Sequence, residues 1–157
     1  MPPRRERKAA PAAGVLLGVG LVAFVDGISL HMILEWHHMV SNVYPPTTLE
    51  AMHVNTFWDG WFHAGAWIVV VLGVAMLWRA VQRGDAIPST RAFLGYILVG
   101  AGLFNLVEGL VDHHLLRLHH VREIADPLLY DVTFLVVGGV LPLVVGWALR
   151  RRGPRYR

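Results

Sequence analysis

Residues 15–25 read VLLGVGLVAFV, a run that leaves no polar side chain on any face of a helix. Residues 68–77, IVVVLGVAML, follow the same pattern. A helix on the surface of a soluble bundle keeps a polar stripe toward water, and neither run has one. A membrane-spanning helix needs about 20 mainly apolar residues to cross the hydrocarbon of a bilayer. Both runs, extended into their flanks, therefore predict helices that cross a membrane.

Stretches of this kind occur four times in the chain. Residues 9–25, 60–78, 92–107 and 132–149 contain no Asp, Glu, Lys or Arg. The composition agrees, because 55% of the 157 residues are hydrophobic and only 16% are charged, against about a quarter charged in an ordinary soluble domain. We expect an all-α polytopic membrane four-helix bundle that forms a single transmembrane domain. Its spans are expected at roughly 12–40, 56–82, 91–119 and 128–149.

Most basic residues lie in three clusters, which the four spans place on one side of the membrane. By the positive-inside rule, both termini and the middle loop are cytoplasmic, in a multi-pass protein of the bacterial inner membrane. The net charge of +3 then indicates topology and contact with anionic lipid, and no nucleic-acid partner. The chain contains no cysteine, which excludes disulfides, thiolate metal sites and iron–sulfur clusters. The clusters comprise Arg4, Arg5, Arg7 and Lys8, then Arg79, Arg83 and Arg91, then Arg150, Arg151, Arg152, Arg155 and Arg157.

The first and third spans resemble each other. Residues 20–27 read GLVAFVDG and residues 102–109 read GLFNLVEG, and at the same offset of 82 three histidine pairs follow. The pairs are His31 with His113, His37 with His119, and His38 with His120. We therefore expect two parallel copies of a two-helix unit, roughly residues 12–82 and 91–149, related by an axis along the membrane normal.

The ionisable residues concentrate toward the outer side of the predicted bundle, which holds all nine histidines. An ionisable side chain inside a span costs about 2.5–3.5 kcal/mol on insertion scales, so a set of them suggests function. Neutral imidazole and carboxylate are ligands for Zn, Fe and Cu. At 100° per residue, His31, Glu35 and His38 would share one helix face within about 60°. We expect the metal ligands among Asp26, His31, Glu35, His38, Asp59, His63, Glu108, Asp112, His113 and His120, with His37, His119, His114, Arg117 and Asp131 supporting them.

Several of these motifs together resemble a known family. The strings are FVDG at residues 24–27, WHHM at 36–39, DGWFH at 59–63, FNLVEGLVDHH at 104–114 and LHHVR at 118–122. They are similar to a bacterial family of small four-span membrane proteins that is catalogued as a domain of unknown function. The resemblance covers roughly residues 14–149 and implies the topology and the polar motifs. It implies no activity.

The chemistry of the polar residues favours a membrane metalloprotein with one or two transition-metal ions, Cu, Fe or Zn, in the outer half of the bundle. Such a site predicts redox or hydrolytic chemistry on a small or lipophilic substrate, and hence a candidate metal-dependent oxidoreductase. A metal or proton transporter, or a factor that delivers metal to another enzyme, would use the same residues. A b-type haem protein, with one histidine from each repeat as axial ligand, is a third alternative. Membrane lipid is an expected partner, and homo-oligomerisation is compatible with a bundle of this size.

Overall fold

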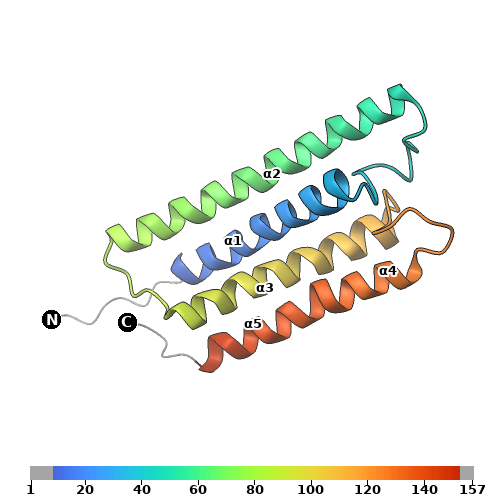
Figure 1. The fold of residues 1–157 in the computed structure, drawn as a ribbon. Coiled ribbons are helices and arrows are strands. Elements are labelled where there is room, and N and C mark those ends of the chain that lie inside the picture. The colour runs from blue at the N-terminus through green and yellow to red at the C-terminus, as the bar shows by residue number, and fades with distance from the viewer. Residues whose placement is uncertain (1–8, 153–157) are drawn as a thin grey trace.

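The computed structural model describes residues 9–152, and all regular elements in this range are helices (Figure 1). Short π-helical segments, labelled η, continue three of the α-helices. No strand is present among these residues. The elements are α1 Ala9–Asp26, η1 Gly27–Ile33, α2 Leu49–Gln82, α3 Thr90–Glu108, η2 Gly109–Leu115, α4 Leu128–Thr133, η3 Phe134–Val140 and α5 Leu141–Arg152.

The described residues form four helices long and apolar enough to cross a membrane, as the sequence predicted. These are Ala9–Ile33, Leu49–Gln82, Thr90–Leu115 and Leu128–Arg151. The first and third end earlier than expected, so residues 34–40 and 116–119 lie in loops. The physical reason is at Glu35 and Arg117, whose φ angles of 48° and 52° are left-handed. A right-handed helix cannot continue through such a residue.

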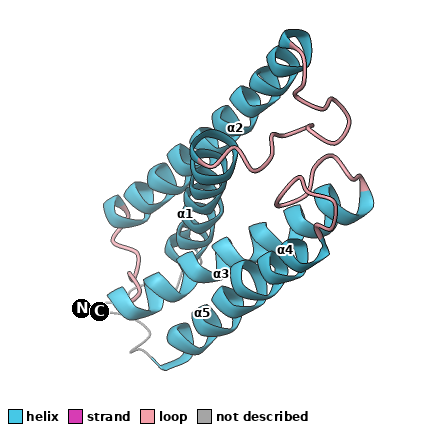
Figure 2. Cartoon of the chain, turned by 45° about the vertical axis from the view of Figure 1, so that its right-hand side comes forward, coloured by secondary structure: helices cyan, strands magenta, loops and turns pink. Residues whose placement is uncertain are grey.

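The four spans form a row in which α1 and α3 are central. Helix α2 packs against α1, and α5 with η3 packs against α3 (Figure 2). Helices α1 and α3 cross at two glycines that leave no room for a side chain. A Cβ on Gly18 would lie 2.0 Å from the carbonyl oxygen of Ile97, and a Cβ on Gly100 would lie 2.0 Å from that of Val15. Small residues at helix contacts are typical of membrane bundles, where close backbone packing stabilises association.

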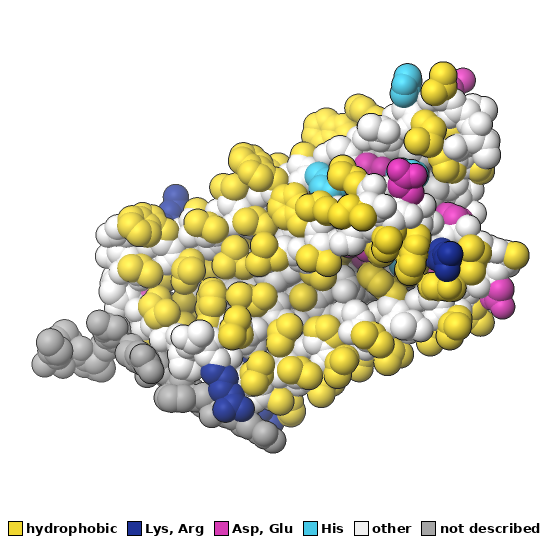
Figure 3. Space-filling model, in the orientation of Figure 1, with side chains coloured by type: hydrophobic (Ala, Val, Ile, Leu, Met, Phe, Trp, Pro, Cys, Tyr) yellow, Lys and Arg dark blue, Asp and Glu magenta, His cyan; other side chains and the backbone are white. Residues whose placement is uncertain are grey.

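The surface of the bundle is largely apolar. Large side chains such as Trp67, Trp78 and Leu72 are more than half exposed on α2, and apolar side chains cover most of the face shown in Figure 3. The interior has the opposite character, since the largest fully buried side chains are polar. Such a surface suits lipid. The largest fully buried side chains are His31, His113, His119, Asn55 and Asp131.

The two ends of the bundle differ. Helix α1 begins, α5 ends and the α2–α3 connection runs at one end (Figure 1). The loops of residues 34–48 and 116–127 cover the other end, where acidic and histidine side chains gather (Figure 3). The basic clusters predicted to face the cytoplasm are only partly described, because Arg4, Arg5, Arg7, Lys8, Arg155 and Arg157 lie outside the described residues.

Candidate metal centre

Two buried groups of three side chains lie at the loop-covered end of the bundle. The first group is Asp26, His31 and His37, and the second is Glu108, His113 and His119. Within each group, one potential ligand atom from every residue lies within 4.8 Å of the others. None of the six residues is more than 6% exposed. Each group therefore offers two imidazoles and one carboxylate, all buried, that could hold a metal ion.

The π-helical segments explain how each carboxylate meets its first histidine. Asp26 and His31, like Glu108 and His113, are five residues apart. On an α-helix this spacing places two side chains about 140° from each other. Hydrogen bonds from i to i+5 widen the turn, so that residues five apart face the same way. His31 Nε2 consequently lies 3.3 Å from Asp26 Oδ2, and His113 Nε2 lies 3.1 Å from Glu108 Oε1.

The second histidine of each group comes from the loop after the π-helical segment. The rings of His37 and His119 stack with their centroids 4.4 Å apart and an angle of 8° between their planes. His37 also lies 4.5 Å from the ring of His31, and His119 lies 4.9 Å from that of His113. The two groups are therefore neighbours, and together they form one cluster across the centre of the bundle.

Each loop histidine is held by the opposite loop. His37 Nδ1 lies 2.8 Å from the carbonyl oxygen of Val121, and His119 Nδ1 lies 3.0 Å from that of Met39. A carbonyl oxygen can only accept, so Nδ1 carries the proton in both rings. Nε2 of His37 has no hydrogen-bond partner among the described residues, whereas Nε2 of His119 lies 3.1 Å from Glu108 Oε1. Burial first, and then the neighbouring His119 and His31, lower the pKa of His37 well below its usual range. His37 is thus neutral, the form of imidazole that binds a metal.

Two aspartates accept hydrogen bonds from Nδ1 of three further histidines, His31, His38 and His120. Asp59 accepts from His31 Nδ1 at 2.8 Å, from His38 Nδ1 at 2.7 Å and from the Met39 amide at 2.8 Å. A carboxylate on the far nitrogen of a ligand histidine fixes the ring orientation and raises its basicity. We expected Asp59 to be a ligand. It lies instead outside both groups and contacts the far nitrogen of His31.

Asp131 occupies the corresponding position in the second half of the chain. It accepts from His120 Nδ1 at 2.7 Å and from the Val121 amide at 2.9 Å. Its contact with His113 Nδ1 is longer, at 3.7 Å. Asp131 thus orients His120 firmly and His113 more loosely.

Several atoms of the cluster are buried without a hydrogen-bond partner among the described residues. They include both carboxylate oxygens of Asp26, Nε2 of His31, Nε2 of His37 and Oε2 of Glu108. Buried polar atoms are normally paired, because leaving one unpaired costs about 1–3 kcal/mol. Here unpaired lone pairs of two residue types converge on the same space. A transition-metal cation fits this donor set, since it accepts imidazole nitrogen and carboxylate oxygen together.

The structure does not bring all the sequence-predicted ligands together. The expected helix face of His31, Glu35 and His38 does not exist, because the helix ends at Ile33. Glu35 is exposed in the loop that follows, and Asp112 is only half-buried on η2. His120 points to Asp131, as His38 points to Asp59. His114 and Arg117, expected in support, are exposed.

His37 and His119 enter the two groups, although we expected them only among the supporting residues. The signal that identifies them was present, because they are matched at the same offset as His31 and His113. What the sequence could not supply was the reversal of the loop that returns each ring to the cluster. This reversal begins at the left-handed residues Glu35 and Arg117.

Aromatic rings close the cluster toward the apolar part of the bundle. Phe62 stacks on His31 with centroids 5.4 Å apart, and Phe134 lies 5.4 Å from His113. His63, expected as a ligand, lies next to Phe62, with Nδ1 2.7 Å from the carbonyl oxygen of Asp59. Its Nε2 is buried without a hydrogen-bond partner in the described chain. A Cβ on Gly27 would lie 2.6 Å from this atom, so His63 packs against the backbone beside Asp26.

Comparison with known proteins agrees with the topology and adds no activity. No curated protein and no solved structure matches the chain. A family model described as a predicted membrane protein, DUF2243, matches residues 13–153. This range contains all four apolar spans except the first turn of α1, and every residue of the two buried groups. The chain therefore belongs to the DUF2243 family of predicted membrane proteins.

Proposed function

We propose that this protein is a membrane metalloenzyme with a two-metal centre, one ion in each group of two histidines and one carboxylate. The observation that carries the proposal is the direction of the imidazoles. His31, His37 and His119 each present Nδ1 to a fixed acceptor, which leaves Nε2 as the ligand atom. Four imidazoles and two carboxylates, all buried and with three of the imidazoles held through Nδ1, form a prepared site for cations.

The donor set favours redox chemistry. Two histidines and one carboxylate, with coordination positions left open, form the set used by non-haem iron oxygenases. When bound, such ions would activate dioxygen or water, the chemistry of an oxidoreductase or a hydrolase. The protein's own residues bind and orient: Asp59 and Asp131 hold the rings, and Phe62 and Phe134 restrict water on the apolar side. The substrate is small or lipophilic, since the centre lies within a lipid-facing bundle.

The packing of the histidines favours metal ions over haem. A haem between two axial histidines needs a flat apolar slot between their rings. The rings of His37 and His119 are instead in direct stacking contact at 4.4 Å. His31 and His113 each face a carboxylate. None of these four imidazoles is therefore poised for axial ligation of a porphyrin.

On this proposal the two halves, residues 12–82 and 91–149, are copies of one two-helix unit. Several matched features support this. The π-helical segments Gly27–Ile33 and Gly109–Leu115 have the same length and are 82 residues apart. The left-handed residues Glu35 and Arg117 are separated by the same offset, as are the crossing glycines 18 and 100. The centre then lies on the pseudo-two-fold axis.

The centre is proposed to face the extracytoplasmic side of the bacterial inner membrane, with both termini in the cytoplasm. The basic residues support this orientation. Arg79, Arg83 and Arg91 flank the α2–α3 connection, and Arg150 and Arg151 end α5, all at the end away from the histidines. Basic residues near span ends remain on the cytoplasmic side.

Metal content tests the proposal directly. The detergent-purified protein is exposed to Cu, Fe or Zn and washed, and bound metal is measured by mass spectrometry together with the visible absorption spectrum. We expect about two ions per chain, about one in His31→Ala, and almost none in His31→Ala with His113→Ala, because each group keeps too few ligands.

His53→Ala is the matched control, since His53 is exposed at the start of α2 and outside both groups. Circular dichroism checks that each variant keeps its helices. A wild-type chain that stays free of metal, or a double variant with unchanged metal content, would refute the proposal.

A further inference from the structure

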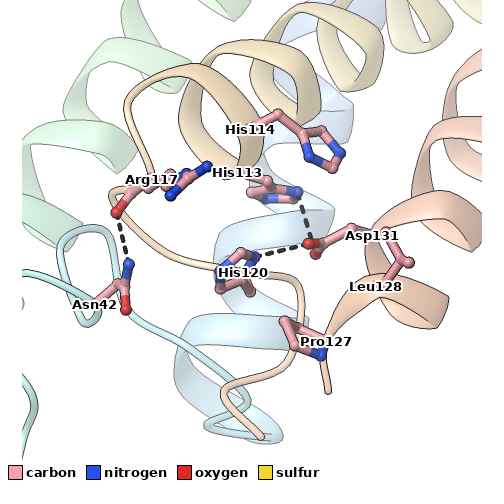
Figure 4. A pocket seen from close by; sticks show the side chains of 8 residues that line it. All are labelled: Asn42, His113, His114, Arg117, His120, Pro127, Leu128 and Asp131. Atoms are coloured by element: carbon pink, nitrogen blue, oxygen red, sulfur yellow. Dashed lines mark hydrogen bonds and ion pairs between the residues drawn. The ribbon is translucent and has the colours of Figure 1, made fainter. Parts of the chain in front are cut away.

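A polar pocket of about 350 Å³ opens beside the Glu108 group (Figure 4). It lies between the loop after η2 and the start of α4, at the loop-covered end of the bundle. Its volume is at the lower end of the range of small-molecule sites, about 300–1,000 Å³. The lining residues are Asn42, His113, His114, Arg117, His120, Pro127, Leu128 and Asp131.

The carboxylate in this lining is already engaged. Asp131 accepts from His120 Nδ1 and from the Val121 amide, and it faces His113. An incoming cation would therefore have to compete with these bonds. Asn42 donates from Nδ2 to the carbonyl oxygen of Arg117 at 2.9 Å and so fixes the backbone of the pocket wall. Among the exposed side chains of the lining, the guanidinium of Arg117 and the imidazole of His114 remain to meet a ligand.

His113 connects this pocket to the metal centre. Its side chain is 1% exposed and its Nε2 faces Glu108 at 3.1 Å. Its Nδ1 is buried without a hydrogen-bond partner among the described residues, and the ring lines the pocket (Figure 4). A ligand in the pocket would thus lie against a residue of the Glu108 group. It could reach the pocket from solvent at the loop-covered end of the bundle.

The corresponding positions of the first half carry different chemistry. At the offset of 82, Arg117 corresponds to Glu35, and His114 corresponds to Met32. The basic pair of Arg117 and His114 is therefore confined to the Glu108 side of the centre. The corresponding pair in the first half has one acidic side chain, Glu35, and one apolar side chain, Met32.

We infer that this pocket binds a small oxyanion, a carboxylate or phosphate group, as substrate or exogenous ligand beside the Glu108 group. Arg117 supplies a charge-assisted contact of the bidentate kind that guanidinium makes with such groups. The group belongs either to a soluble anion or to the head group of an anionic lipid. The inference rests on the proposed function only in placing a metal ion next to His113.

Formate, the smallest carboxylate, is the probe. Its binding to the full-length protein in nanodiscs of zwitterionic lipid is measured by saturation-transfer NMR, on the metal-free and the Zn-loaded protein. Arg117→Gln is expected to raise the formate Kd about tenfold, the size of one charge-assisted hydrogen bond. Arg117→Lys should restore part of the affinity. Glu35→Gln, at the corresponding exposed position, should leave it unchanged.

An equal formate Kd in wild type and Arg117→Gln, or no saturation transfer to the wild type, would overturn the inference. Anionic lipid in the nanodiscs separates the two sources. A raised formate Kd identifies a lipid head group as the occupant, and an unchanged Kd identifies a soluble anion. Metal content measured on the same samples keeps this test separate from that of the proposed function, because formate binding is scored with and without metal.

Discussion

The Asp26 group and the Glu108 group are built alike and surrounded differently. Each has a carboxylate and a histidine five residues apart at the end of a central helix, and a second histidine from the loop. In the first group the supporting aspartate, Asp59, lies 2.8 Å from His31. In the second, Asp131 lies 3.7 Å from His113. The proposed ligands are thus matched where a metal requires it, while the contacts behind them are not.

The residues that surround the two groups differ in polarity and in how far they admit solvent or a ligand. His63 packs beside the Asp26 group, and the residue 72 positions later, Leu135, packs on Gly109 beside the Glu108 group. Two positions of one architecture can differ in affinity and in ligand access through such neighbours, because the surroundings control solvent access and ligand orientation. We therefore expect a firmly bound ion on the Asp26 side and the exchangeable position on the Glu108 side.

The largest effect is expected at the helix crossing, where the two halves should respond equally. In Gly18→Ala and in Gly100→Ala the new methyl group would meet a backbone carbonyl at 2.0 Å. We expect each substitution to lower the free energy of unfolding by about 3 kcal/mol, at the upper end of the usual cost of overpacking. The cost is high because a backbone carbonyl, unlike a side chain, cannot rotate away from the new methyl group.

Unfolding in mixed detergent measures this effect. Gly65→Ala is the control, since a Cβ there would meet nothing within 4 Å. A loss in one crossing variant and not in the other would show that the two halves do not share the crossing equally.

A smaller and unequal effect is expected at the supporting aspartates. Asp59→Asn should raise the Kd for the bound metal about 10–100-fold, the usual result of removing such a partner. Asp131→Asn should raise it less, because its contact with His113, the proposed ligand, is long. Competition with a chelator of known affinity gives both values, and Glu50→Gln, at the exposed start of α2, is the control. Equal losses would mean that the difference in distance is without consequence.

The smallest effect is expected from His63→Leu, which gives the first half the residue of the second. The change removes a buried nitrogen that has no hydrogen-bond partner in the described chain. We expect the metal content to stay the same and the metal-free protein to gain about 1 kcal/mol in unfolding free energy. Metal analysis and denaturation measure the two quantities. Loss of one ion would instead make His63 a ligand of the Asp26 group.

The spans could be predicted from the sequence because crossing a bilayer requires length and apolarity, and both are visible in runs such as residues 15–25. The residue types of the centre could also be predicted, because ionisable side chains in apolar helices are energetically costly and therefore suggest a function. Their grouping was not. A helical projection at 100° per residue assumes an α-helix, and Gly27–Ile33 and Gly109–Leu115 wind as π-helices.

The sequence was also uninformative about which carboxylates enter the two buried groups. Asp26 and Asp59 are both acidic residues in apolar helices. Asp26 makes the 3.3 Å contact with His31 Nε2 but no hydrogen bond among the described residues, whereas Asp59 accepts three hydrogen bonds. The difference depends on where the loop of residues 34–48 returns to the bundle. This path depends on the left-handed backbone at Glu35, which no local sequence pattern predicts.

The reciprocal bonds of the loop histidines have a consequence for biogenesis. His37 is held by the backbone of the second half and His119 by that of the first. A ribosome that has delivered only the first two spans has therefore made a hairpin whose His37 lacks its anchor. The two buried groups are complete only after the last pair of helices has been inserted and has packed against the first pair. On the proposed function, metal would therefore be incorporated late, after the two hairpins have packed against each other.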